Sequence, residues 1–170
     1  GTKLIQMVSI DLVVDDLPCE QPDVVSPADR IAVEDVPVFD YRLYPITNAL
    51  ADKFNALFET HEGRPSSRVK DLVDILVYMR MADIDGSSLS HAVKREANIR
   101  GVNLPAQFSL PDEWLDHYRS VYSKLANQAN LPPESSNLSE ASKQVASFYD
   151  PLQTGTADEK TRSPSNQRWS

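Results

Sequence analysis

The spacing of apolar residues changes at Pro45, and this change limits the folds open to the chain. Before Pro45, apolar and polar side chains alternate over residues 3–14 and again over residues 38–44, as they do along β-strands. After Pro45, apolar residues recur three and four positions apart, which is the spacing of one helix face. The chain is therefore predicted to have an α+β fold, in which the remnant of a sheet precedes a mostly helical bundle.

Start and stop signals divide the helical part into about five helices. Gly63 and Pro65 end the first helix, and Pro111 suits the first turn of the fourth. The predicted helices cover residues 46–62, 66–81 and 88–101, with two more starting at 111 and 137. We therefore expect three regions: residues 1–44 as a partial sheet with its connection, 45–153 as a helical domain, and 154–170 as a polar, disordered tail.

Composition narrows the setting in which the protein works. The net charge of −8 makes it a poor candidate for coating nucleic acid, although a local basic cluster can still bind phosphate. No apolar run approaches the roughly 18 residues of a membrane span, and the front of the chain lacks the features of a secretory signal. The single cysteine, Cys19, rules out an internal disulfide. A cytoplasmic protein that does not contact a membrane is expected.

Charged residues gather in residues 44–76, where a short Gly-Pro-Ser loop joins the first two predicted helices. Lys53 lies off the apolar stripe of the first helix, and the second helix carries Arg68, Asp71 and Asp74 at spacings of three. The loop adds hydroxyls at a helix start, which favours anions. This set suits a triphosphate. On spacing alone, a solvated helix face with weak ion pairs is the more common explanation.

The order of residues in this segment resembles the AbiEii family, whose members are nucleotidyltransferase-like toxins of type IV toxin–antitoxin systems. Tyr44 and Pro45 are followed by Ala-Asp-Lys at 51–53 and by Ser-Arg-x-Lys-Asp-Leu-x-Asp at 67–74. The family commonly has Glu where this chain has Asp52. The resemblance extends over about residues 3–153, and it implies that residues 1–44 belong to a nucleotidyltransferase sheet.

The resemblance also implies roles for individual residues. Lys53 and Asp71 would be catalytic, and Lys53 and Arg68 would bind the nucleotide. Asp11, in the predicted strand 3–14, would be a metal ligand, and Asp74 would support the site or form a structural salt link. The complete protein would use Mg²⁺ and a nucleoside triphosphate, or NTP, and would transfer nucleotides to RNA, such as tRNA, or to a protein. A cognate antitoxin would control it.

One part of the family's pattern is missing from the sequence. The Gly-Ser turn and the Asp-x-Asp strand, which supply two metal carboxylates, have no counterpart, and residues 83–86 (Asp-Ile-Asp-Gly) are interpreted as a turn. We therefore expect the chain to be a C-terminal portion that is inactive by itself, because one carboxylate binds Mg²⁺ poorly. The alternative is a non-catalytic helical module that binds a partner protein.

Two further groups of residues leave alternatives open. Trp114, Tyr118 and Tyr122 recur every four residues, and core packing is the main interpretation of this stripe, with stacking on bases as the alternative. The basic residues between 94 and 100 are interpreted as a solvated face or, alternatively, as a contact for RNA. The histidines show no ligand spacing, so zinc is not expected.

Overall fold

The computed structural model describes residues 21–28, 35, 37 and 39–170. The predicted strand 3–14, with the proposed metal ligand Asp11, lies outside these residues. Six α-helices, one 3₁₀ helix and three pairs of short antiparallel strands make up the described part, which confirms the α+β fold class. None of the helices in this part is long and apolar enough to cross a membrane.

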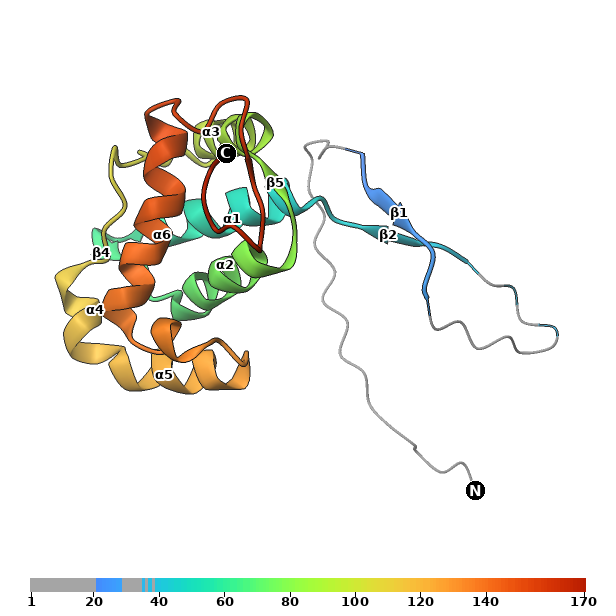
Figure 1. The fold of residues 1–170 in the computed structure, drawn as a ribbon. Helices are drawn as coiled ribbons and strands as arrows, with labels where there is room; N and C mark the ends of the chain where they lie inside the picture. The colour runs from blue at the N-terminus through green and yellow to red at the C-terminus, as the bar shows by residue number, and fades with distance from the viewer. Residues whose placement is uncertain (1–20, 29–34, 36, 38) are drawn as a thin grey trace, which may run out of the picture.

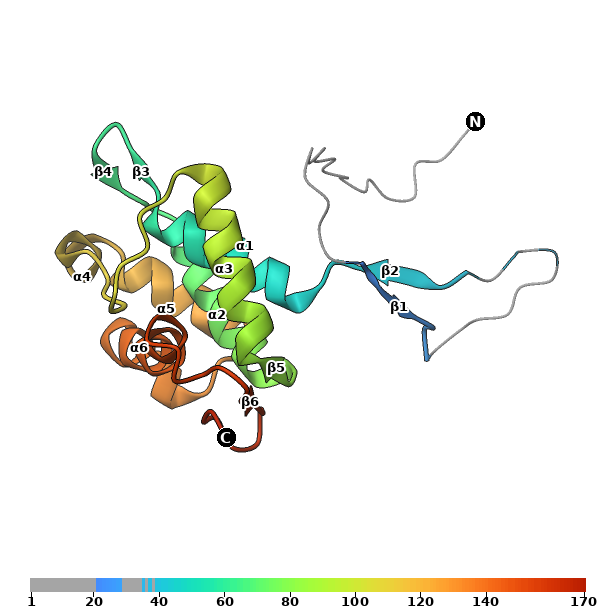
Figure 2. The same cartoon turned by 90° about the horizontal axis from the view of Figure 1, so that it is seen from above.

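The first strand pair is a ribbon that projects from the helical body (Figures 1 and 2). Strands β1 (Asp23–Val25) and β2 (Tyr41–Leu43) run antiparallel, with Val24 opposite Arg42. All six residues of the ribbon are exposed. The strand expected over residues 38–44 is therefore present in its second half, and it leads directly through Tyr44 and Pro45 into the first helix.

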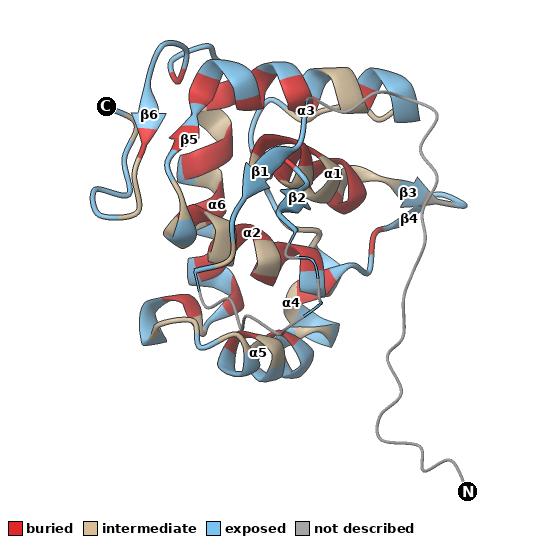
Figure 3. Ribbon diagram, turned by 90° about the vertical axis from the view of Figure 1, so that its right-hand side faces the viewer, coloured by how far each residue is buried: buried red, intermediate tan, exposed pale blue. Residues whose placement is uncertain are grey.

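Helices α1 (Ile46–Phe58), α2 (Val69–Met81) and α3 (Gly86–Arg100) form the centre of the molecule. In Figures 1 and 3 the helices follow the order α3, α1, α2 and α5 across the body, and their buried residues face one another. The apolar stripes predicted from the sequence supply this core: Leu50, Phe54, Leu72, Leu76 and Leu89 are fully buried. The amide of Asn55 adds a polar link from α1 to α3, because Nδ2 donates to the Val93 carbonyl at 3.2 Å.

Helix α1 ends four residues before the expected residue 62. Strands β3 (Thr60–His61) and β4 (Arg64–Pro65) form a tight hairpin there instead. Glu62 and Gly63, between the strands, have φ values of 53° and 76°. These left-handed conformations are incompatible with a continuing α-helix. The hairpin carries the chain to the start of α2, where Trp114 Nε1 donates to the Ser66 carbonyl at 2.7 Å.

The predicted fourth helix is divided at Tyr118 into α4 (Asp112–His117) and α5 (Arg119–Gln128). Tyr118 has a φ of −114°, which breaks the regular helix. Trp114 and Tyr122 are buried, and the Tyr122 hydroxyl donates to the Ser135 carbonyl. Core packing is thus confirmed for these two aromatic residues. The 3₁₀ helix η1 (Pro133–Ser135) leads to α6 (Leu138–Gln153), whose first turn is capped by Asn137.

The last segment differs from the disordered tail expected over residues 154–170. Strands β5 (Ile84–Asp85) and β6 (Thr161–Arg162) pair antiparallel, so residues 83–86, which were expected to form a turn, instead hold a short strand that leads directly into α3. The Trp169 ring stacks on Phe148 at 5.2 Å between centroids, and its Nε1 donates to the Phe148 carbonyl. Ala157 is fully buried. A few apolar anchors and backbone pairing therefore hold a segment whose composition is mostly polar.

Candidate functional site

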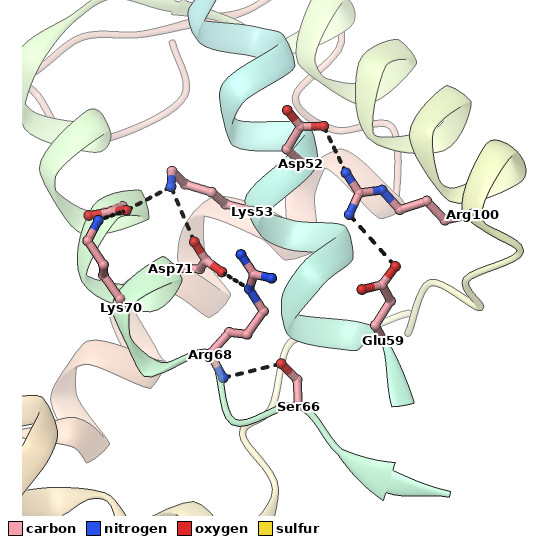
Figure 4. Close-up of polar contacts among 9 residues, drawn as sticks. Asp52, Lys53, Glu59, Ser66, Arg68, Lys70, Asp71 and Arg100 are labelled. Carbon is pink, nitrogen blue, oxygen red and sulfur yellow. Dashed lines mark hydrogen bonds and ion pairs between the residues drawn. The ribbon is translucent and has the colours of Figure 1, made fainter. Parts of the chain in front are cut away.

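A hollow of about 320 Å³ opens where the side of α1, the start of α2 and the end of α3 meet. Figure 4 shows that its charged side chains come from all three helices. The lining residues are Tyr44, Ala49, Asp52, Lys53, Ala56, Arg68, Asp71, Tyr78 and Arg100. Most of them are polar or charged, so the hollow is suited to a polar or charged ligand rather than an apolar one.

Lys53 lies at the centre of one wall and joins α1 to α2. Its Nζ is 2.7 Å from Asp74 Oδ2 and 3.2 Å from Asp71 Oδ1, and its side chain is only 19% exposed. Burial by itself would lower the pKa of Lys53. The hydrogen bonds and negative charges of Asp74 and Asp71 outweigh that effect and raise the pKa above its ordinary value. Lys53 is thus a fixed positive charge at the hollow.

Asp71 and Asp74 each bridge two cations. Asp71 Oδ2 accepts from Arg68 Nε at 2.6 Å, and Asp74 Oδ2 accepts from Lys70 Nζ at 2.7 Å. Burial would raise the pKa of Asp74, but hydrogen bonds from Lys53 and Lys70 lower it overall. The structure therefore brings together the predicted residues Lys53, Arg68, Asp71 and Asp74.

The opposite wall is a second ion-pair group around Arg100. Its Nη2 is 3.1 Å from Asp52 Oδ1, its Nε is 2.5 Å from Glu96, and its Nη1 is 3.7 Å from Glu59. Tyr44 donates from its hydroxyl to Asp52 Oδ2 at 3.1 Å. Burial raises the pKa of Asp52, and burial together with the Asp52 charge raises the pKa of Tyr44 to about 12.

The sequence assigns no functional role to Tyr44 or Asp52, and for Arg100 it offers only the alternative of an RNA contact. Tyr44 and Asp52 stand in the segment that carries the family resemblance, which is the signal that pointed to them. Its spacing places Arg100 with the basic residues of α3 that are expected to face solvent. In the structure its side chain is only 30% exposed and turns toward α1. Its partner Asp52 lies 48 residues earlier, so local spacing could not identify the pair.

The described residues do not fit a magnesium site. The carboxylates at the hollow are each paired with at least one cation, and residues 21–28, 35, 37 and 39–170 contain no group of three or more potential ligands that could hold a metal. The Asp-x-Asp of residues 83–85 does not compensate, because Asp85 caps α3 through the Ser88 amide at 2.8 Å. It stands at the opposite end of α3 from Arg100, roughly 20 Å away at 1.5 Å per residue.

Ion pairs use most of the charged groups of the hollow and leave some donors of Arg68 available. Four cations (Lys53, Arg68, Lys70 and Arg100) face five carboxylates (Asp52, Glu59, Asp71, Asp74 and Glu96) in the described ion pairs. Arg68 is 59% exposed, and within the described part it bonds Asp71 only through Nε. Its terminal Nη nitrogens can therefore donate to an incoming anion without breaking that bond.

Together these features define an α+β protein whose helical part carries a polar hollow walled by ion pairs. The model of one family, described as "Nucleotidyl transferase AbiEii toxin, Type IV TA system", matches residues 2–162. The chain therefore belongs to the AbiEii family of nucleotidyltransferase-like toxins, which confirms the resemblance found in its sequence. No curated protein and no solved structure gives a significant match.

Acid is expected to weaken the ion pairs of Asp74. Because its pKa is lowered from 3.8 in the folded state, Asp74 contributes stability above that ordinary value and loses it as the pH falls through the folded value. Lys53 has a raised pKa, so its contribution is lost only as the pH rises through that raised value. When the pH falls from about 6 to about 2, the free energy of unfolding should therefore decrease less in Asp74→Asn than in the native protein. The difference between the two decreases should be less than about 1 kcal/mol, because the group is partly exposed.

Urea unfolding at both pH values measures this difference. Glu140→Gln is the matched control, since Glu140 forms an exposed pair with Lys143 far from the hollow. Equal acid sensitivity in Asp74→Asn and the native protein would contradict the role given to Asp74.

Proposed function

We propose that the hollow binds the triphosphate of an NTP and that the protein transfers the nucleotide to an RNA or protein acceptor. The observation that carries this proposal is the meeting of Lys53, Arg68 and Asp71 at one polar hollow, beside the start of α2. A half-buried lysine and an exposed arginine supply fixed positive charge and directed donors, which phosphate oxygens require. Membership of the AbiEii family supports the reaction type.

In the proposed reaction, an acceptor hydroxyl oxygen forms a bond to the α-phosphorus. The bond from that phosphorus to the bridging oxygen breaks, and pyrophosphate leaves with the electron pair while the acceptor's proton passes to solvent. Lys53 and Arg68 hold phosphate oxygens, and Asp71 fixes both cations in position. Asp74 holds Lys53 from the other side, and Asp74 is itself held by Lys70.

Metal chemistry in this proposal depends on residues beyond the described hollow. Mg²⁺ would neutralise phosphate charge when bound, and Asp11 is the residue of this chain proposed as its ligand. The described carboxylates are already paired with cations. We therefore propose that the chain by itself binds an NTP and transfers little or no nucleotide. The partners would be the NTP, an RNA such as tRNA, and a cognate antitoxin in the cytoplasm.

Isothermal titration of the full chain with each of the four NTPs tests the binding step. At least one triphosphate is expected to bind, and the matching nucleoside is expected to bind at least about tenfold more weakly, because it has no anionic oxygens for Lys53 and Arg68. Equal affinity for nucleoside and triphosphate would argue against the proposed site. Failure of all four triphosphates to bind would favour the alternative, a non-catalytic helical module that binds a partner protein.

A further inference from the structure

A second concave surface lies on the other side of Arg68 from the hollow. This groove has a volume of about 330 Å³ and runs between the start of α2 and the face of α5. Figure 1 shows α5 passing beneath α2 in the helical body. The groove is lined by Ser67, Arg68, Val69, Lys70, Asp71, Tyr118, Val121 and Leu125. Because Arg68 and Asp71 also line the hollow, the two spaces adjoin.

The two sides of the groove differ in chemistry. The α2 side presents the exposed cations Arg68 and Lys70, whose side chains are 59% and 72% exposed. The α5 side is apolar, with half-buried Tyr118 and Leu125, and with Val121 at 45% exposure. One wall therefore offers positive charge, and the facing wall offers an apolar surface that includes an aromatic ring.

The aromatic ring of this groove is held in place from below. Tyr118 packs edge-on against Trp114, with ring centroids 5.6 Å apart. Trp114 is itself buried and bonded through Nε1 to the Ser66 carbonyl, next to the start of α2. The break between α4 and α5 falls at Tyr118, so this residue is placed by the corner of the two helices rather than by one regular helix. A ring fixed in this way binds a flat partner with little loss of entropy.

We propose that this groove holds the acceptor end of a single-stranded RNA, with a base against Tyr118 and Val121 and one phosphate at each of Arg68 and Lys70. The inference rests on the proposed function, because it assigns the acceptor of the same reaction. Alternating flat bases and phosphates match one apolar wall and one cationic wall. A peptide acceptor has no such alternation of flat bases and phosphates, so it matches the two walls less well. The shared Arg68 would then hold the acceptor beside the triphosphate.

The two local cations, rather than the net charge of the protein, set the strength of the RNA contact. The chain carries a net charge of −8, so attraction to RNA comes from the local pair of cations and not from the whole molecule. With two phosphate contacts, the logarithm of the association constant should fall with the logarithm of salt concentration at a slope of about −1.4. A much steeper slope would indicate a larger basic surface elsewhere.

Fluorescence anisotropy of a labelled single-stranded RNA oligonucleotide, titrated with the full chain in the absence of NTP, tests the groove. Val121→Glu and Lys70→Glu should each weaken RNA binding by about tenfold or more, because each places a carboxylate beside the RNA. The matched controls are Ile99→Glu and Lys143→Glu. They have similar exposure, at 44% and 69%, and lie on α3 and α6. Both should bind RNA within about twofold of the native protein.

The outcomes separate this inference from the proposed function. Val121 does not line the hollow, so Val121→Glu should keep its NTP affinity within about twofold while losing RNA. If no NTP binds but RNA binding depends on Val121 and Lys70, the proposed function fails and the RNA groove stands. Two results would overturn the groove: no RNA binding by the native chain at about 1 mM, or equal weakening by Val121→Glu and Ile99→Glu. Melting curves establish that each variant is folded.

Discussion

Replacing Lys53 by methionine is expected to weaken NTP binding about thirtyfold or more, which corresponds to roughly 2 kcal/mol for one charge-assisted contact. Lys53 is the least exposed cation of the hollow, at 19%, and Asp71 and Asp74 hold it from two sides. A triphosphate therefore meets a positive charge that is already oriented. Methionine keeps the length and packing of the side chain but removes the charge.

The fold should tolerate this substitution. Without Lys53, Asp71 keeps its bond to Arg68 and Asp74 keeps its bond to Lys70, so neither carboxylate is left without a cation. Titration calorimetry gives the NTP affinity, and a thermal melt checks folding. Lys143→Met is the control, because Lys143 has a similar ion pair on the exposed face of α6. An NTP affinity that is unchanged in a folded Lys53→Met protein would remove Lys53 from the site.

A second variant separates binding from positioning at the same wall. Asp71→Asn removes a negative charge that competes with phosphate for Lys53 and Arg68. NTP affinity should therefore hold or increase. Nucleotide transfer, measured in a longer protein that also supplies the Asp-x-Asp carboxylates, should fall, because Arg68 loses its fixed partner and Lys53 keeps only Asp74. Opposite effects of Lys53→Met and Asp71→Asn on NTP affinity would distinguish an anion site from a purely structural salt link.

The α1–α2 wall of the site could be predicted because its geometry is local. Spacings of three within one helix bring Arg68 and Asp71 together whatever the rest of the fold does. Lys53 lies off the apolar stripe of α1, and the hairpin between the helices returns α2 along that face. Periodicity therefore predicts the fold class, and the family resemblance adds the grouping of these residues at one site. The match to the AbiEii model includes this segment.

The second wall required long-range information that periodicity does not contain. Asp52 and Arg100 meet only because α3 packs along α1, and that packing is set by buried groups such as Asn55 and Val93. From the sequence, Arg100 looked like its basic neighbours on α3. Only the fold distinguishes the residue that turns toward α1 from those that face solvent.

The packing of residues 154–170 depends on a different kind of information. A polar composition indicates that a segment cannot build its own core, but it does not exclude packing on a core that others provide. Residues 154–170 contribute two apolar contacts: Ala157 is buried, and Trp169 stacks on Phe148 of α6. Arg162, which is itself a tail residue in β6, completes the attachment: it is buried, donates to the Met79 carbonyl at 2.9 Å and lies 5.1 Å from the Phe148 ring centroid.

Gly86→Ala should destabilise the protein by about 3 kcal/mol, because the tail leaves no room for a side chain at the start of α3. A Cβ on Gly86 would lie 2.0 Å from the Ala157 carbonyl oxygen and 2.9 Å from its carbonyl carbon. These are backbone atoms, so relief requires moving the tail. The same position also donates its amide to the Lys160 carbonyl at 2.9 Å, and that bond would be strained together with the β5–β6 pairing.

Urea unfolding of Gly86→Ala and Gly63→Ala provides the comparison. An added Cβ at Gly63 meets nothing within 4 Å, and its only penalty is the φ of +76°, worth about 1 kcal/mol. A larger loss at Gly86, with faster proteolysis near Thr161, would mean that the tail is part of the folded unit and must be released before α3 can adapt. Equal losses of unfolding free energy in the two variants would mean that the tail can move away from Gly86 at no energetic cost. The helical core would then fold independently of the tail.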